Sequence, residues 1–240
     1  MYENKKFLAI IPARAGSKRL QNKNLLKLNN KPLIGWTIEA GLKSKYIDEV
    51  MVTTDDDNIM QISESCGANV PFKRPKELAT DYATRSQVIN HTINYYKNIK
   101  KKHFDYLIFL QPTSPLRDEI DIDKAIEFMC KKNADAIISV CEVEHPIQWS
   151  GTIPGNKDMT NFLNNSFLQT RSQDLEKYYR LNGAIYICSI EKFLEEECVF
   201  LRNNIFAFEM SQIKSVDIDT KIDFLYASFL MDNKSDFLRQ

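Results

Sequence analysis

The 240-residue chain has no excess of charge of either sign, because Lys and Arg together number 32 and Asp and Glu also number 32. A broadly basic nucleic-acid-binding surface is therefore not expected, and any basic site must be local. The chain also lacks an apolar run approaching the roughly 20 residues of a membrane span. Its first residues, MYENKKF, lack the apolar core of a signal peptide. We expect a cytoplasmic protein without nucleic-acid or membrane partners.

Clustered cysteine and histidine side chains are also missing from the sequence. The five cysteines are scattered without a C-x-x-C pair, and the three histidines lie far apart. This usage is typical of small buried hydrophobic residues in a reducing compartment and does not favour a zinc site. The length suits one large domain, or one domain with an insertion.

Short apolar runs alternate with helical patterns along most of the chain. This alternation indicates βαβ units and an α/β fold with a mostly parallel sheet. The apolar runs are nearly continuous, as expected for strands covered on both faces. Strands are predicted at 7–11, 49–54, 104–110, 134–143, 183–189 and 204–210, and helices at 32–44, 56–67, 84–101, 121–132, 189–197 and 220–231.

The alternation stops between residues 144 and 180. This stretch is polar, rich in turn residues and too long for a plain connection between two elements. We interpret it as an insertion that leaves the sheet within one domain covering residues 1–240.

A basic loop, residues 12–24, follows the first predicted strand. Gly16 allows close approach of the backbone and Ser17 offers a hydroxyl donor, which suits a polyphosphate at the carboxyl edge of a sheet. The loop has neither the P-loop nor the G-x-G-x-x-G pattern, and a solvated basic loop is the alternative. Its four cations within ten residues are Arg14, Lys18, Arg19 and Lys23.

Paired carboxylates occur in the segment SVDIDTKID, residues 215–223. Asp217 and Asp219 are two residues apart, so both side chains can point to one side of an extended segment. Close like charges are costly unless a cation lies between them, and a divalent metal with phosphate oxygens would meet that need. The alternative is a pair of solvated turn residues. For Asp55–Asp57 we expect turn and helix-capping roles.

Further polar segments also border predicted strands. FLQPTSPLR contains Gln111, an amide suited to a polar ligand, and Arg117, which can bind an anion or pair with an acid. FKRPKELATDYA and YYRLNGAIYI are two more such segments.

Taken in order, IPARAGSKRLQNKN, RPKELATDYA, LQPTSPLR, RLNGAIYI and SVDIDT resemble the motifs of the CMP-sialic acid synthetase family, the acylneuraminate cytidylyltransferases, which include enzymes for legionaminic acid. The resemblance covers about residues 6–230. It implies a three-layer, Rossmann-like nucleotidyltransferase fold with a mixed, mainly parallel sheet. It also implies transfer of CMP from CTP to a nine-carbon 2-keto sugar acid with Mg²⁺. The family resemblance further implies a homodimer in which the inserted segment reaches the partner's sugar site.

The resemblance also implies roles for individual residues. Catalysis would rest on two cations of the opening loop and on the two carboxylates that would hold the metal. The nucleotide-binding positions are Arg14, Ser17, Lys23, Asn24, Arg74 and Ala83; the sugar-binding positions are Gln111, Arg171, Asn182 and Gly183; the catalytic positions are Arg14, Lys23, Asp217 and Asp219, of which Asp217 and Asp219 would bind the metal.

Three positions depart from the family pattern. Arg85 stands where a serine linked to the ribose is common, Gln148 stands where a lysine is common, and the alignment of Arg171 is open by one residue. The sugar therefore stays open between N-acetylneuraminic acid and legionaminic acid. A KDO cytidylyltransferase would usually have Gly-Lys-Pro where this chain has Asn22–Asn24. A nucleotide-binding protein without catalysis is the alternative from another class.

Overall fold

The computed structural model describes residues 1–163, 165–167 and 170–233. Its centre is a six-stranded sheet in the order β4-β1-β5-β7-β6-β8, in which β7 runs antiparallel to β5 and β6 while the other neighbouring pairs are parallel. The predicted α/β class with a mixed, mainly parallel sheet is confirmed. The strands are β1 (Phe7–Pro12), β4 (Glu49–Thr53), β5 (Tyr106–Phe109), β6 (Ala136–Glu142), β7 (Tyr179–Ser189) and β8 (Ile205–Glu209), and a separate hairpin pairs β2 (Lys27–Leu28) with β3 (Lys31–Pro32).

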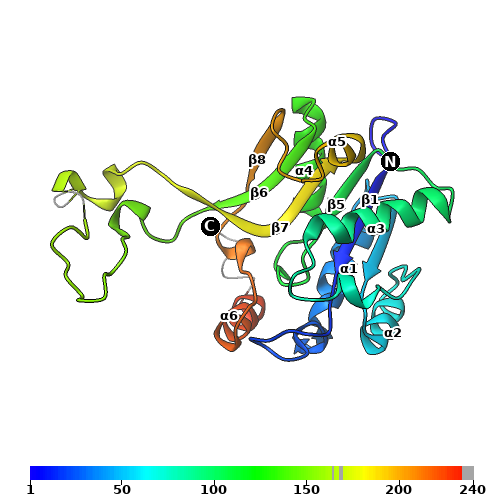
Figure 1. Ribbon diagram of the computed structural model, residues 1–240, viewed down its shortest axis with the longest axis horizontal. Coiled ribbons are helices and arrows are strands. Elements are labelled where there is room, and N and C mark those ends of the chain that lie inside the picture. The colour runs from blue at the N-terminus through cyan, green and yellow to red at the C-terminus, as the bar shows by residue number, and fades with distance from the viewer. Residues whose placement is uncertain (164, 168–169, 234–240) are drawn as a thin grey trace.

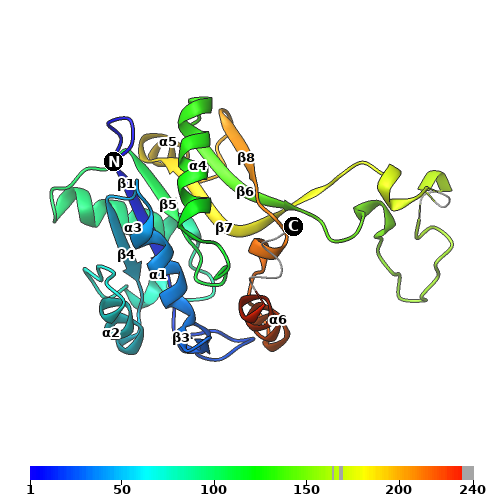
Figure 2. The ribbon, with the colours of Figure 1, turned by 180° about the vertical axis from the view of Figure 1, so that it is seen from behind.

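Helices cover both faces of the sheet and form the outer two of three layers. Alternate residues of β1 show this: Ile11 packs in the cluster that contains residues of α1, α2 and α4, whereas Ile10 packs in the cluster of α3 and α5. Figure 1 shows α3 in front of the sheet, and Figure 2 shows α1 and α4 on the opposite face. The helices are α1 (Leu33–Lys43), α2 (Asp57–Ser65), α3 (Arg85–Asn98), α4 (Glu119–Lys132), α5 (Ile190–Glu196) and α6 (Lys221–Asp232).

The helix starts agree with the sequence patterns to within a few residues, and side-chain caps explain the difference at α4. The sequence predicted a helix from residue 121, but the helix begins at Glu119 because Asp118 caps it. The Asp118 carboxylate accepts a hydrogen bond of 3.2 Å from the backbone N–H of Asp121. Among the described residues, no helix is both long and apolar enough to cross a membrane.

The last helix, α6, is attached to the body by a small apolar cluster of its own. Ala227 and Leu230 of α6 pack with Leu28, Leu33 and Ile218. The cluster holds the segment before α6 against the region that follows β1. Residues far apart in the sequence are thereby brought to the same edge of the sheet.

Residues 143–178, which we call the arm, connect β6 to β7 and extend away from the sheet (Figure 1). The described residues of the arm form three short 3₁₀ helices, η3 (Ile147–Trp149), η4 (Asn165–Phe167) and η5 (Ser172–Asp174). It occupies most of the stretch 144–180 that showed no alternation of strand and helix. β7 begins at Tyr179, four residues before the predicted strand, because its first part pairs with β6 beyond a bulge between Ile138 and Val140.

Candidate functional site

Two adjacent cavities lie at the carboxyl ends of β1 and β5. The large cavity, of about 530 Å³, is lined by residues of the opening loop 12–24, the loop after β5, and the segment before α6. The small cavity, of about 330 Å³, is lined by residues of the loop before α3 and of α3 itself. Pro12, Arg14 and Gln111 line both cavities. We therefore treat the two as one cleft, at the sheet edge where ligands of open α/β folds bind.

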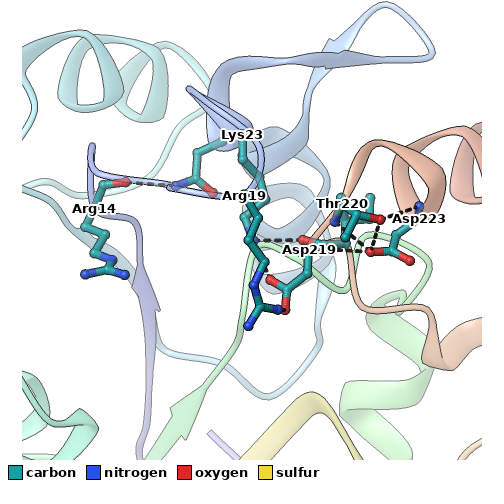
Figure 3. A network of polar contacts seen from close by, with 8 residues as sticks. Arg14, Arg19, Lys23, Asp219, Thr220 and Asp223 are labelled. Carbon is teal, nitrogen blue, oxygen red and sulfur yellow. Dashed lines mark hydrogen bonds and ion pairs between the residues drawn. The ribbon is translucent and has the colours of Figure 1, made fainter. Parts of the chain in front are cut away.

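The opening loop is connected to the segment before α6 by charge. Lys23 Nζ donates hydrogen bonds to Asp219 Oδ1 at 2.9 Å and to the backbone oxygen of Ile218 at 2.8 Å, and Arg19 donates to Asp219 Oδ2 at 2.8 Å. Figure 3 shows both cations directed at this carboxylate. Because the Lys23 side chain is only 13% exposed, its ion pair is less screened by water than a surface pair. The fold therefore brings the basic loop and Asp219 into direct contact.

Asp217, the second predicted carboxylate, also lines the large cavity. Loss of hydration raises the pKa of Asp217, the charge of Asp219 adds to that rise, and a hydrogen bond with Thr113 acts against it. A cation between Asp217 and Asp219 would relieve the cost of ionising both.

These two aspartates fit Mg²⁺ in its usual mode. Within the described part of the chain, no group of three or more His, Cys, Asp or Glu side chains is arranged to hold a metal. Mg²⁺ is commonly bound by one or two carboxylates, with water and substrate phosphates completing its shell. Asp217 and Asp219 supply such a pair beside cations that suit the same phosphates.

Arg14, on the other side of the opening loop, interacts with a residue that the sequence reasoning missed. Its Nη1 lies 2.7 Å from Asp81 Oδ1, and Lys18 pairs with the other oxygen of the same carboxylate. These two cations lower the pKa of Asp81. Figure 3 shows Arg14 lying apart from the group around Asp219. The position of Asp81 within RPKELATDYA was the signal that could have pointed to it.

Buried hydrogen bonds hold the opening loop in place. Asn24, which is almost fully buried, donates to the backbone oxygen of Arg14 at 3.4 Å. Asp55, predicted as a turn residue, accepts from the backbone N–H of Ala15 at 3.1 Å, and Asp56 caps α2 as expected. Ser17 lines the large cavity.

Arg74 forms the inner part of the small cavity, where Ala83 also lies. Only 4% of Arg74 is exposed, and burial lowers the pKa of its guanidinium to about 10. Its Nε donates to Thr53 Oγ1 at 3.0 Å, and its Nη2 donates to the backbone oxygen of Thr53. The end of β4 thus fixes the guanidinium at one end of the cleft.

Gly183 closely approaches Gln111, the glutamine that lines both cavities. Gly183 has a φ of +74°, and a Cβ atom at this position would lie 2.5 Å from Gln111 Oε1 and 3.9 Å from Asp217 Oδ2. Only glycine adopts this backbone conformation without strain and leaves room for the glutamine. The predicted sugar-binding positions 111 and 183 therefore lie beside Asp217, one of the two predicted metal ligands.

The other predicted sugar-binding side chains lie elsewhere. The Asn182 amide is buried: its Oδ1 accepts from Ser139 Oγ at 2.6 Å, and its Nδ2 donates to Ser215 Oγ at 2.9 Å. Its side chain therefore ties β6 and β7 to the segment after β8. Arg171 is exposed on the arm, and the arm extends away from the body that carries the cleft (Figure 2).

Two further arginines take positions that the sequence did not predict. Arg117 is 1% exposed and donates to Thr37 Oγ1 at 2.8 Å, so it braces the loop after β5 and does not line either cavity. Burial lowers its pKa to about 10. Arg85, one of the departures from the family pattern, lines the small cavity.

Known proteins resemble this chain over nearly its whole length. The sequence profile described as Cytidylyltransferase matches residues 8–240. N-acylneuraminate cytidylyltransferase of Escherichia coli O18:K1:H7 is 36% identical over 96% of this chain, which spans 53% of that relative. The pseudaminic acid cytidylyltransferase of Campylobacter jejuni serotype O:2 is 31% identical over 97% of this chain and 100% of its own length. CMP-N,N'-diacetyllegionaminic acid synthase of Legionella pneumophila is 35% identical over 95% and 97%.

The fold is shared with solved cytidylyltransferase structures. CMP:2-keto-3-deoxy-manno-octonic acid synthetase complexed with CTP superposes with a TM-score of 0.68, at 21% identity, over 95% of this chain and 99% of the other. At this identity the likeness shows the fold, in agreement with the predicted nucleotidyltransferase architecture. Together with the profile match and the relatives of 31–36% identity, it places the chain plainly: this nucleotidyltransferase belongs to the cytidylyltransferase family.

Proposed function

We propose that the protein transfers CMP from CTP to a nine-carbon 2-keto sugar acid and releases pyrophosphate. The observation that carries the proposal is the order of side chains along the cleft. Arg74 and Ala83 lie at one end, Lys23 and the paired aspartates at the other, and Gln111 lines both cavities between them. A nucleoside can occupy the first end, its phosphates the second end, and a sugar hydroxyl the position beside Gln111 between them.

The chemistry requires charge stabilisation and positioning more than covalent catalysis. The anomeric hydroxyl oxygen bonds to the α-phosphorus, the bond from that phosphorus to the bridging oxygen breaks, and pyrophosphate departs as the hydroxyl proton is released. Arg14 and Lys23 lie where negative charge grows on the leaving oxygens. Arg14 would exchange Asp81 for a phosphate when CTP binds, since both acceptors compete for one guanidinium.

We further propose that Asp217 and Asp219 hold Mg²⁺ with the triphosphate. The bound ion would supply Lewis-acid stabilisation of phosphate charge. The raised pKa of Asp217 supports this role, because burial and the nearby charge of Asp219 make its ionised form costly unless a cation lies beside it. Lys23 and Arg19 would keep the Asp219 carboxylate oriented through their ion pairs.

The sugar acid we favour is N-acetylneuraminic acid, with legionaminic acid as the near alternative. The names of the relatives include N-acylneuraminate, pseudaminic acid and N,N'-diacetyllegionaminic acid. Gln148, which stands where a lysine is common, lies on the arm and donates to the backbone oxygen of Glu176 at 3.0 Å. Two of the three departures, Gln148 and Arg171, thus lie in the part of the chain that we expect to contact the sugar.

In a homodimer, the arm of one subunit could contact the cleft of the other. Arg171 and Gln148 lie on an arm that extends away from the cleft of the same chain, and the arm exposes Ile147, Trp149 and Ile153 by 40–63%. Exposed apolar side chains of this size commonly mark an interface. We propose that each arm completes the sugar site of the partner subunit.

The function is tested by pyrophosphate release with CTP and Mg²⁺. N-acetylneuraminic, legionaminic and pseudaminic acids and KDO are compared at equal concentration, and product identity is checked by mass spectrometry. A CMP-sugar formed preferentially from one nine-carbon acid is the expected outcome. Preference for KDO, or CTP binding without transfer to any of the acids, would contradict the proposal.

Mixing two inactive variants tests the shared site. Arg171→Ala and Lys23→Met are each expected to lose most activity. Equimolar mixing with subunit exchange should restore part of it, because a mixed dimer contains one site with both native residues. Mass photometry reports the assembly state. If Arg171→Ala and Lys23→Met exchange subunits but the mixture regains no activity, the proposed arrangement is contradicted.

A further inference from the structure

A cation of the small cavity, Arg85, has no role so far. It is the first residue of α3, directly after the Thr84 cap, whose side chain and Gln87 form a capping box. Its Cζ lies 4.1 Å from the centre of the Tyr186 ring and 5.3 Å from that of Phe109. Because Phe109 and Tyr186 are paired across β5 and β7, the guanidinium rests on two rings that the sheet itself positions. The side chain is therefore placed in advance of ligand binding.

The other cations of the cleft already have protein acceptors. Asp81 and Asp219 accept ion pairs from four of them, and Thr53 accepts from the fifth; the five are Arg14, Lys18, Arg19, Lys23 and Arg74. In the described part of the chain, Arg85 makes no hydrogen bond or ion pair with a carboxylate, hydroxyl or carbonyl oxygen. Aromatic rings attract the cation through their faces but accept no conventional hydrogen bond, so its N–H donors stay available.

Arg85 is also next to the residues that join the two cavities. Phe109, on which it rests, precedes Gln111 by two residues at the end of β5, and both Gln111 and Arg14 line the small cavity with Arg85. A planar guanidinium with free N–H groups suits an oxyanion, which it can bind through two parallel hydrogen bonds.

We infer that Arg85 binds an oxyanion of the substrates, either the carboxylate of the sugar acid or the α-phosphate of the nucleotide. The inference rests on the proposed function for the identity of these ligands. Both groups share the chemistry that Arg85 offers, and both must meet near Gln111 if the sugar hydroxyl is to reach the α-phosphorus. Arg85 is then a binding residue that the family motifs did not assign.

The test uses Arg85→Met, which keeps an unbranched side chain over the rings, and Arg85→Lys, which keeps the charge but loses the fork. Two ratios are measured. One is the preference, as kcat/KM, for the sugar acid over its methyl ester; the other is the binding preference for CMP over cytidine, by calorimetry. We expect Arg85→Met to reduce one of these ratios by about tenfold or more, since a charge-assisted hydrogen bond is lost. Arg85→Lys should lie between Arg85→Met and the unchanged protein.

The ratio that falls identifies the oxyanion. A fall in the acid-to-ester preference assigns Arg85 to the carboxylate, and a fall in the CMP-to-cytidine preference assigns it to the α-phosphate. Unchanged ratios in Arg85→Met, with or without lower stability, would overturn the inference and leave Arg85 a packing residue.

Lys132→Met is the matched control. Lys132 is also held by two rings, 5.8 Å from that of Phe128 and 5.6 Å from that of Phe206, but it lines neither cavity. Its loss should leave both ratios unchanged. The CMP-to-cytidine comparison and calorimetric binding of the sugar acid and its ester need no turnover. Failure of the proposed reaction would therefore appear as an inactive unchanged protein, and failure of this inference as ratios that Arg85→Met does not alter.

Discussion

The cleft and the arm are built in different ways. In the cleft, ion pairs join residues that are far apart in the sequence: Lys23 and Asp219 are separated by 196 positions, and Arg14 meets Asp81. The arm has only short 3₁₀ helices in its described residues and exposes large apolar side chains. The cleft is held by contacts between loops at the edge of the sheet, whereas the described residues of the arm form no part of the six-stranded sheet.

We infer from this difference that the two regions contact different substrates. Side chains that suit a nucleotide triphosphate are gathered by one chain, because the ends of neighbouring parallel strands bring their loops together. Side chains expected to read the sugar are split between the cleft, at Gln111 and Gly183, and the distant arm, at Arg171. The comparison predicts that changes in the arm impair use of the sugar acid with little effect on CTP binding, and that changes in the opening loop impair CTP binding.

Removal of the arm is expected to have the largest effect. Residues 144–177 are replaced by a short Gly-containing turn, which is feasible because Glu142 and Tyr179 are direct partners in neighbouring strands. CMP transfer should fall by about a hundredfold or more, because the sugar is no longer positioned. CTP affinity, measured by calorimetry, should change little. If a folded protein without the arm transfers CMP at an undiminished rate, the arm does not position the sugar acid.

Asp219→Ala should come next, with turnover lowered on the order of a hundredfold, because metal-borne stabilisation of phosphate charge is worth several kcal/mol. Steady-state pyrophosphate release measures the effect. Asp232→Ala is the matched control: this carboxylate is on α6, hydrogen-bonds Asn29 at 2.9 Å and lines neither cavity. Near-normal turnover of the Asp219 variant would contradict the metal assignment.

Lys23→Met should raise the KM for CTP by about tenfold or more, since it removes a charge-assisted contact to the triphosphate. Lys27→Met, which removes an exposed lysine of β2 nearby, should leave this KM unchanged. The separate KM values for CTP and for the sugar acid are the measurement. An effect confined to sugar selectivity would show that the opening loop does not hold the triphosphate.

Gly183→Ala is expected to have the smallest effect on binding and a measurable one on stability. The methyl group would lie 2.5 Å from Gln111 Oε1 at a backbone φ of +74°. We expect the free energy of unfolding to fall by ~1 kcal/mol or more, because alanine does not fit this conformation. The KM for the sugar acid should rise through displacement of Gln111.

Gly155→Ala provides the comparison for that variant, because no heavy atom beyond the adjacent residues lies within 4 Å of the added methyl group and the position is on the arm. Urea unfolding of both variants separates the two cases. Equal stability of the two, with an unchanged KM for the sugar, would show that the close approach of Gly183 and Gln111 has no role in the sugar site.

The sequence alone determined the elements and the kind of chemistry. Apolar runs and helical periodicity located the main strands and helices because both sheet faces are buried, which leaves a continuous apolar signal in each strand. The opening loop could be placed at a ligand-binding edge because it directly follows the first strand. Asp217 and Asp219 could be proposed as metal ligands from their spacing alone.

Only the tertiary structure decided which distant residues meet. The position of β7 between β5 and β6 depends on strand pairing over long separations, which local patterns do not encode. That pairing sets Tyr186 beside Phe109 and so creates the platform for Arg85. It also buries the Asn182 amide between Ser139 and Ser215. The physical reason is that a side chain's neighbours depend on the register and order of strands, whereas its local sequence specifies only the element to which it belongs.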